Sequence, residues 1–376
     1  MEERLSGGGA AVVSEARAGE LLADVRAGVA TITLNRPGAL NALSFGMIEE
    51  MPRLLDAWER DDAVRVVVLR GAGEKAFCAG GDIRMLHDSF RAGTEGYHDF
   101  FIREYALDHR IHRYPKPVVA LVDGIVMGGG MGISQGAALR IVGDRTRMAM
   151  PETTIGLFPD VGGSYFLSRV PGKLGIYLGL AGPTMRAADA LYCGLADIYL
   201  SPGSMARVDE WMAEAAASKD PRAAVKALAS RDERGSLPPA EIAALRPAID
   251  RHFGAPTVEA IMASLASEAG EHREWAQRTL EALAKRSPTM LKVTLEQLQR
   301  GATMGLADCF RMELGLIYTC FEQGDFVEGI RALIVDKDNR PHWRPPAIDA
   351  VDQAAVARFF APRWSPAQTH PLYHLR

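Results

Sequence analysis

Glycine-rich turns that follow short apolar strands are the feature that most constrains this fold. A β-branched segment at Val64–Leu69 leads into a turn that ends at Gly80-Gly81, and a similar segment at Val118–Val122 leads into the triplet Gly128–Gly130. Helical sequence follows the turns. Strand, turn and helix, repeated at short spacing, predict a parallel α/β architecture with the turns gathered along one edge.

The same turns predict a functional site. A backbone N–H at a glycine turn beside a helix N-terminus has no intrahelical partner. Gly81 and Gly129 can therefore direct two N–H groups at one oxygen, as an oxyanion hole does. Two carboxylates follow eight residues apart in apolar sequence, Glu152 and Asp160. Carboxylates in such surroundings are rare unless they are paired or functional.

The residues present do not match two other functions of glycine-rich turns, phosphate binding and the nucleophile elbow. A G-x-G-x-x-G dinucleotide motif needs a glycine where Ile133 or Gln135 stands, and the sequence contains no P-loop. A nucleophile elbow around Ser164 needs a glycine at Phe166. The turns therefore favour stabilisation of a carbonyl oxygen.

Four elements in order resemble the crotonase (enoyl-CoA hydratase/isomerase) superfamily. They are Phe77–Asp82, Gly124 with the glycine triplet, Pro151-Glu152, and Gly156–Gly163, and the resemblance covers roughly Leu21–Leu200. Two further segments, Val335–Asp338 and Trp343–Pro346, resemble its 3-hydroxyisobutyryl-CoA hydrolase branch. The resemblance implies an α/β spiral of ββα units with a helical C-terminal region. It also implies an acyl-CoA thioester site in which Gly81 and Gly129 donate to the thioester carbonyl.

Two positions decide the expected reaction. Hydratases of this superfamily usually carry a catalytic glutamate where this chain has Gly132, and commonly a glycine where it has Asp160. We therefore expect hydrolysis of a short β-hydroxyacyl-CoA, with 3-hydroxyisobutyryl-CoA, an intermediate of valine breakdown, as the first choice. The alternatives are an enoyl-CoA hydratase or isomerase, and a non-catalytic acyl-CoA-binding protein.

Each candidate residue has an expected role. Glu152 attacks the thioester or activates water, while Asp160 orients the water or substrate hydroxyl and shares a proton with Glu152. Whether Glu152 forms an acyl anhydride or acts as a base stays open. The resemblance adds two substrate-binding residues, Glu104 for the 3-hydroxyl and Asn41 on the loop that holds the adenine end. The competing interpretations are helix caps for Glu152 and Asp160, and a solvated face or an arginine pair for Glu104.

Composition narrows the class of protein. The net charge of −4 gives no basic field for nucleic acid, and no stretch approaches the ~20 apolar residues of a membrane span. Four scattered cysteines, without a C-x-x-C pair, indicate a reducing compartment, and we expect a cytoplasmic location. We expect no metal and no cofactor, since coenzyme A is part of the substrate. The sequence leaves open whether the chain forms a homo-oligomer.

Three regions are expected along the chain. Residues 1–19 are predicted to form a flexible tail, 20–204 the acyl-CoA-binding core, and 205–376 a helical cap and tail. Apolar residues at i, i+3, i+4 and i+7 within Val258–Leu265 and Leu291–Leu298 support the helical assignment of the last region.

Overall fold

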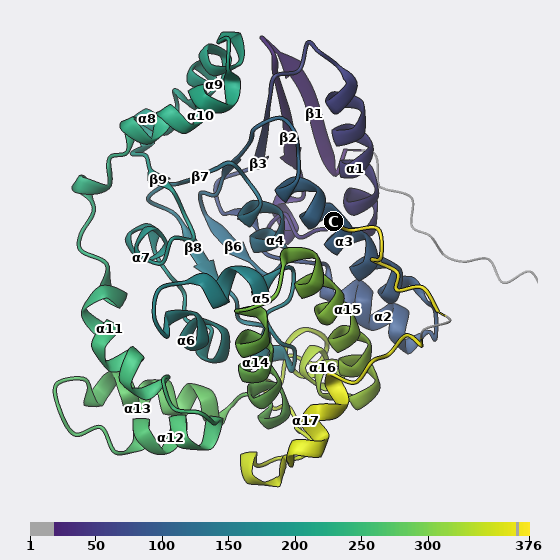
Figure 1. The fold of residues 1–376 in the computed structure, drawn as a ribbon, viewed down its shortest axis with the longest axis vertical. Coiled ribbons are helices and arrows are strands. Elements are labelled where there is room, and N and C mark those ends of the chain that lie inside the picture. Colours follow the sequence, from purple (N-terminus) through teal and green to yellow (C-terminus); the bar gives the residue numbers. More distant parts are fainter. Residues whose placement is uncertain (1–18, 366–367) are drawn as a thin grey trace, which may run out of the picture.

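A computed structural model describes residues 19–365 and 368–376 of the chain (Figure 1). The tail predicted over residues 1–19 lies outside the described residues except for Gly19. None of the helices in the described ranges is long and apolar enough to cross a membrane.

A six-stranded sheet forms the first layer of the fold. Its outermost pair is an antiparallel hairpin that turns at Ala27-Gly28, and all its other neighbouring strands are parallel. In spatial order the strands are β1 (Leu21–Arg26), β2 (Val29–Leu34), β3 (Val66–Gly71), β5 (Val118–Leu121), β7 (Leu139–Val142) and β9 (Ile198–Tyr199). The parallel α/β architecture predicted from the strand and turn pattern is confirmed, and the antiparallel hairpin adds one strand at its edge.

A smaller parallel sheet of three strands lies beyond the turns. It contains β4 (Ala76–Cys78), β6 (Ile125–Met127) and β8 (Arg147–Ala149), in that order. Each of these strands follows one strand of the large sheet, and β4 and β6 lead into α2 (Ile83–Arg91) and α4 (Gly129–Gln135). Strand, strand and helix therefore repeat, as the expected spiral of ββα units requires.

Two long helices of the core pack against each other. Helix α1 (Phe45–Arg60) begins after Ser44, whose Oγ accepts a 3.2 Å hydrogen bond from the N–H of Met47. Its buried face is apolar, as its spacing predicts. Helix α3 (Gly96–His112) packs against α1, α2 and α4. A largely buried helix beside the glycine turns can direct side chains at them.

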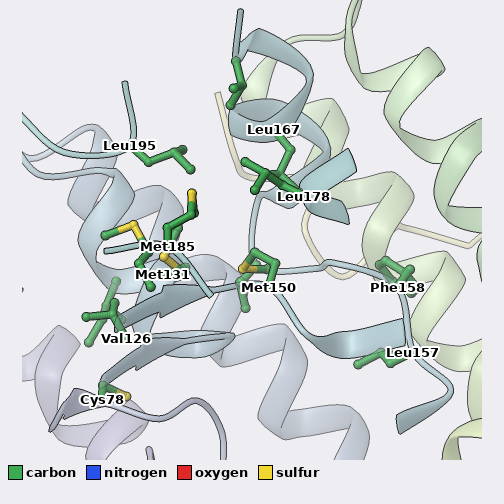
Figure 2. Close-up of a cluster of buried hydrophobic side chains, with 14 of the residues drawn as sticks. Cys78, Val126, Met131, Met150, Leu157, Phe158, Leu167, Leu178, Met185 and Leu195 are labelled. Atoms are coloured by element: carbon green, nitrogen blue, oxygen red, sulfur yellow. The ribbon is translucent and has the colours of Figure 1, made fainter. Parts of the chain in front are cut away.

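The two sheets and the C-terminal helices share one buried apolar cluster. Cys78 and Val126 of the small sheet lie in it with Met131 and Met150 (Figure 2). Phe310 and Leu316 of α15 (Leu306–Gln323) belong to the same cluster. Leu157 and Phe158, which lie between Glu152 and Asp160, also belong to this cluster (Figure 2). Their buried side chains therefore hold the segment that carries the two carboxylates against the core.

The helices of the C-terminal region pack against two different parts of the core. Helix α9 (Val208–Ala217) contacts β2 and β3, and a second apolar cluster joins its Trp211 to Val66 of the sheet. Helices α14 (Pro288–Gly301), α15 and α16 (Asp325–Ile330) lie together on the other side, where α14 and α15 pack against α5 (Gly163–Phe166) and α16 packs against α2 and the 3-10 turn that begins at Glu152 (Figure 1). The division at 204/205 falls inside the short helix α8 (Pro202–Met205) and stays a prediction.

Candidate active site

A buried cavity of about 240 Å³ lies where the glycine turns, α3 and the segment 151–161 meet. Its lining is mainly apolar and includes Phe326 of α16 and Leu333 of the π-helical turn Arg331–Val335. Five of the six predicted site residues line this one cavity: Gly81, Glu104, Gly129, Glu152 and Asp160. The fold thus brings together residues that are up to 79 positions apart in the sequence.

The two glycine turns approach each other closely. A Cβ atom placed on Gly129 would lie 3.3 Å from the nitrogen of Gly81 and 2.4 Å from Oε1 of Glu104, so a side chain at that position would displace the Glu104 carboxyl and press on the first turn. Gly81 lies in the turn between β4 and α2, and Gly129 is the first residue of α4. Within the described ranges, neither N–H donates to a turn, loop or side-chain acceptor. Both N–H groups are therefore free to bind a ligand oxygen, as an oxyanion hole requires.

Glu152 lies against the second turn. It opens a 3-10 turn (Glu152–Ile155) and is 5% exposed, and its Oε1 would lie 3.2 Å from a Cβ on Gly128. Its Oε2 has no hydrogen-bond partner in the part of the chain that the structure describes. Burial, followed by the negative charge of Asp160, raises the pKa of Glu152 well above its ordinary value.

Asp160 faces the same cavity from the loop that precedes α5 (Gly163–Phe166). It is 4% exposed, and its Oδ2 accepts a 2.8 Å hydrogen bond from the hydroxyl of Tyr105. Burial raises the pKa of Asp160 to about 7, while the hydrogen bond from Tyr105 acts in the opposite direction. Two buried carboxyls with raised pKa values in one cavity tend to hold a proton between them at neutral pH.

Glu104 comes from the middle of α3 and is 2% exposed. Its Oε1 has no hydrogen-bond partner among the described residues, and burial followed by the charge of Asp160 raises its pKa well above the ordinary value. The neighbouring Arg103 points elsewhere, 3.4 Å from Glu49. Glu104 therefore neither lies on a solvent-exposed helix face nor pairs with this neighbouring arginine.

Asn41 does not line the cavity. Its Nδ2 donates to the carbonyl oxygens of Ala72 and Ala76 at 2.9 and 2.8 Å, and its Oδ1 accepts from the N–H of Arg36 at 2.9 Å. The side chain is buried and its hydrogen-bonding groups are engaged within the protein. It joins its own loop to the start of β4, and its role in substrate binding stays a prediction.

Two buried residues next to the site, neither of which lines the cavity itself, were missed from the sequence. Tyr105 and Asp108 both lie on α3 and are fully buried, and neither oxygen of Asp108 has a hydrogen-bond partner in the described residues. The i, i+4 spacing of Glu104 and Asp108 was the available signal, since it places both carboxyls on one face of the helix.

Asp108 also accounts for the glycine at position 132. A Cβ atom on Gly132 would lie 2.6 Å from Oδ2 of Asp108 and 2.7 Å from Cβ of Val161. The space in which a side chain at position 132 would begin is thus already filled. A carboxylate cannot project from α4 at this position without displacing its neighbours.

Comparison with known proteins agrees with this geometry. A family model described as enoyl-CoA hydratase/isomerase matches residues 29–360. The chain belongs to this family. A solved structure of a carnitinyl-CoA dehydratase from Mycobacterium thermoresistibile is 40% identical to this family member, with a TM-score of 0.83, covering 93% of this chain and 98% of that one.

Two curated relatives of this family member have different names. The mitochondrial 3-hydroxyisobutyryl-CoA hydrolase of Gallus gallus is 41% identical, covering 92% of this chain and 89% of the relative. The small ribosomal subunit protein mS47 of Neurospora crassa is also 41% identical, covering 86% of this chain and 68% of the relative.

The expected cytoplasmic location is wrong by this comparison. The relatives that are named as 3-hydroxyisobutyryl-CoA hydrolases are named as mitochondrial, which points to the mitochondrion. All four cysteines are free and buried. Free thiols indicate a reducing compartment and do not distinguish one such compartment from another, which is why the cysteine argument failed.

Proposed function

We propose that this chain hydrolyses the thioester of a short β-hydroxyacyl-CoA, with 3-hydroxyisobutyryl-CoA as the first substrate to test and valine breakdown as its context. The observation that carries the proposal is the placement of Glu152 and Asp160 in one buried cavity with the free N–H groups of Gly81 and Gly129. The name of the Gallus gallus relative supports the choice of acyl group.

The first step of the reaction uses the two glycine turns. A water oxygen, or the carboxylate of Glu152, forms a bond to the thioester carbon, and the carbonyl π electrons move to oxygen. The N–H groups of Gly81 and Gly129 stabilise the resulting oxyanion. Loss of one such donor typically lowers kcat by about 10²–10³-fold.

The carboxyl pair handles the protons. Glu152 accepts a proton from the attacking water or attacks directly, and the carbon–sulfur bond then breaks as the oxyanion collapses. The proton held between Glu152 and Asp160 goes to the departing thiolate, which leaves as CoA with a free thiol. After attack by water the other product is the hydroxy acid. After direct attack it is an acyl anhydride of Glu152, which a water molecule then hydrolyses to the hydroxy acid and the free carboxyl group. Glu104 faces the same cavity and is placed to accept a hydrogen bond from the substrate hydroxyl.

Hydration of an enoyl-CoA is the rival reaction in this family. One similar solved structure is named as a carnitinyl-CoA dehydratase, so hydration has to be tested as an alternative. It needs a second acid–base carboxyl, which in hydratases usually comes from the position of Gly132, and the packing of Asp108 and Val161 leaves no room there. A non-catalytic role, suggested by the relative named as a ribosomal protein, gives no reason for a buried cavity that holds two candidate catalytic carboxyls.

The test is release of free thiol from a panel of acyl-CoAs. We expect 3-hydroxyisobutyryl-CoA to be cleaved, and Glu152→Gln and Asp160→Asn to lower kcat by at least about 10²-fold each. Asp88→Asn, at an exposed position of α2, is the matched control and should keep the parent rate. Loss of crotonyl-CoA absorbance without thiol release would instead establish a hydratase.

Two further measurements refine the mechanism. Turnover in ¹⁸O-labelled water, followed by mass spectrometry of the peptide that contains Glu152, tests the anhydride route. Label in that carboxylate shows that water opened an anhydride at the glutamyl carbon, since the general-base route leaves the carboxylate unlabelled. Activity after treatment with a chelator tests the expectation that the reaction uses no metal or other cofactor, which predicts an unchanged rate.

A further inference from the structure

The loop that carries Asp160 has an unusual backbone. The N–H of Gly163 donates to the carbonyl oxygen of Asp160 at 2.7 Å, and both central residues of this turn have positive φ, +51° at Val161 and +88° at Gly162. This is the pattern of a type I′ turn, in which Asn-Gly is the preferred central pair. A β-branched residue is poorly suited to the first central position.

Val161 has a separate reason to be there. It lines the cavity and is 3% exposed, and its Cβ fills the space in front of Gly132. The cavity therefore needs an apolar, branched side chain at a position whose backbone disfavours one. A conformation of this kind persists only where the surrounding structure holds it in place.

Two buried residues of the C-terminal helices contact the turn from outside. Glu313 of α15 accepts from the N–H of Gly162 through Oε2 and from the N–H of Ser164 through Oε1, both at 2.8 Å. Gln297 of α14 donates through Nε2 to the carbonyl oxygen of Pro159 at 2.6 Å and to Oγ of Ser164 at 2.8 Å. Both side chains are fully buried, and α14 and α15 each pack against α5.

The acceptors and donors match the turn on both sides of Asp160. The two carboxyl oxygens of Glu313 accept from the N–H groups on either side of Gly163, and the amide nitrogen of Gln297 donates to the carbonyl that precedes Asp160. None of these contacts involves the cavity itself, since neither Glu313 nor Gln297 lines it.

We propose that Glu313 and Gln297 are positioning residues, which hold the Asp160–Gly163 turn in its left-handed conformation and thereby direct the Asp160 carboxyl into the cavity. The inference rests on the proposed function, because it gives the C-terminal helices a part in hydrolysis through Asp160. Loss of either contact allows Val161 to relax toward negative φ and turns Asp160 away from the substrate.

The test is a double-mutant cycle on kcat and KM for the acyl-CoA that the parent cleaves. We expect Glu313→Gln to lower kcat by at least about tenfold with KM within about threefold, because the thioester site itself is intact. In a Val161→Asn background, where the turn favours positive φ by itself, the effect of Glu313→Gln should shrink by at least about threefold. Glu322→Gln, on the exposed face of the same helix, is the control and should leave kcat unchanged.

Several results would overturn the inference. Parent-like kcat in Glu313→Gln would do so, as would an equal loss in both backgrounds, which would show that Glu313 does not act through the turn. If Glu313→Gln does not fold, Gln297→Met takes its place in the same cycle, and failure of both to fold would make these residues structural only.

A crystal structure of Glu313→Gln gives a readout that does not depend on activity. We expect Val161 to leave the positive-φ region or the turn to lose its order, and an unchanged turn would contradict the inference. Absence of thiol release by the parent would be a failure of the proposed function alone.

Discussion

The hydroxyl of Tyr105 donates a 2.8 Å hydrogen bond to Oδ2 of Asp160 in a site where both residues are fully or almost fully buried. This bond stabilises the ionised form of Asp160, whose pKa burial raises to about 7. The protonation of the catalytic pair near neutral pH therefore depends on a tyrosine that touches the carboxyl directly.

Tyr105→Phe removes this hydrogen bond and should raise the pKa of Asp160 further. Activity requires a pair that holds one proton, so the acidic limb of the pH–rate profile, where the pair holds two, should move to higher pH. We expect kcat near pH 7 to fall by about three- to tenfold and to recover at about pH 8–9. Tyr114→Phe removes the hydroxyl of another buried tyrosine, which donates to the carbonyl of Leu55, and should leave the profile unchanged. An unshifted acidic limb in Tyr105→Phe would contradict the assignment.

Gly129→Ala tests the oxyanion hole. The new methyl group would lie 2.4 Å from Oε1 of Glu104 and 3.3 Å from the nitrogen of Gly81, so the Glu104 carboxyl must move and the Gly81 N–H is crowded. We expect kcat to fall by about 10²–10³-fold, as for loss of an oxyanion donor. Gly203→Ala is the control, because a Cβ at Gly203 meets no atom within 4 Å. Thermal unfolding of both variants separates a loss of catalysis from a loss of folded protein.

Asp108→Asn should make the protein more stable at alkaline pH. Burial, and then the charge of Glu104, raises the pKa of Asp108 well above its ordinary value, so the native state binds this proton more tightly than the unfolded state. The stability that this proton contributes is complete below the unfolded pKa of about 3.8 and is lost as pH rises toward the folded pKa.

Denaturant unfolding at two pH values measures this effect. The difference in unfolding free energy between Asp108→Asn and the parent should favour the variant more at about pH 8 than at about pH 5, by roughly 1–3 kcal/mol. Asp88→Asn, on exposed α2, should show no such pH-dependent difference. A variant that is equally destabilised at both pH values would show that the Asp108 carboxyl is needed in its ionised form.

Gly132→Glu places a carboxylate where hydratases usually carry one. The new Cβ would lie 2.6 Å from Oδ2 of Asp108 and 2.7 Å from Cβ of Val161, and overpacking of this kind typically costs about 1–3 kcal/mol. We expect a lower unfolding midpoint and no hydration of crotonyl-CoA. A variant with parent-like stability that hydrates crotonyl-CoA would show that the packing around position 132 does not decide the reaction.

The sequence predicted those parts of the site that depend on local backbone chemistry. Gly81 and Gly129 follow strands and precede helices, so their free N–H groups follow from the pattern, and Glu152 and Asp160 stood out as carboxylates in apolar surroundings. The parallel sheet followed from the same alternation of strands and turns.

The remaining contacts could not be predicted, because they join distant segments. Glu313 accepts from Gly162 across 151 positions, and nothing near Glu313 in the sequence marks its partner. The contacts of Asn41 also could not be predicted from its neighbours in the sequence, because its amide donates to the carbonyl oxygens of Ala72 and Ala76. Its loop position was visible, but the tertiary partners of its side chain were not.

The contact between Gly132 and Asp108 restricts how this chain could acquire another activity. A larger residue at position 132 meets both Asp108 and the Cβ of Val161, and removal of Asp108 alone leaves the 2.7 Å contact with Val161, so neither single substitution leads directly to a well-packed hydratase site. Any route between the two chemistries must pass through a poorly packed intermediate or change both positions together. Exchange between hydrolase and hydratase in this scaffold is therefore a two-residue event, and libraries that vary one position at a time will not find it.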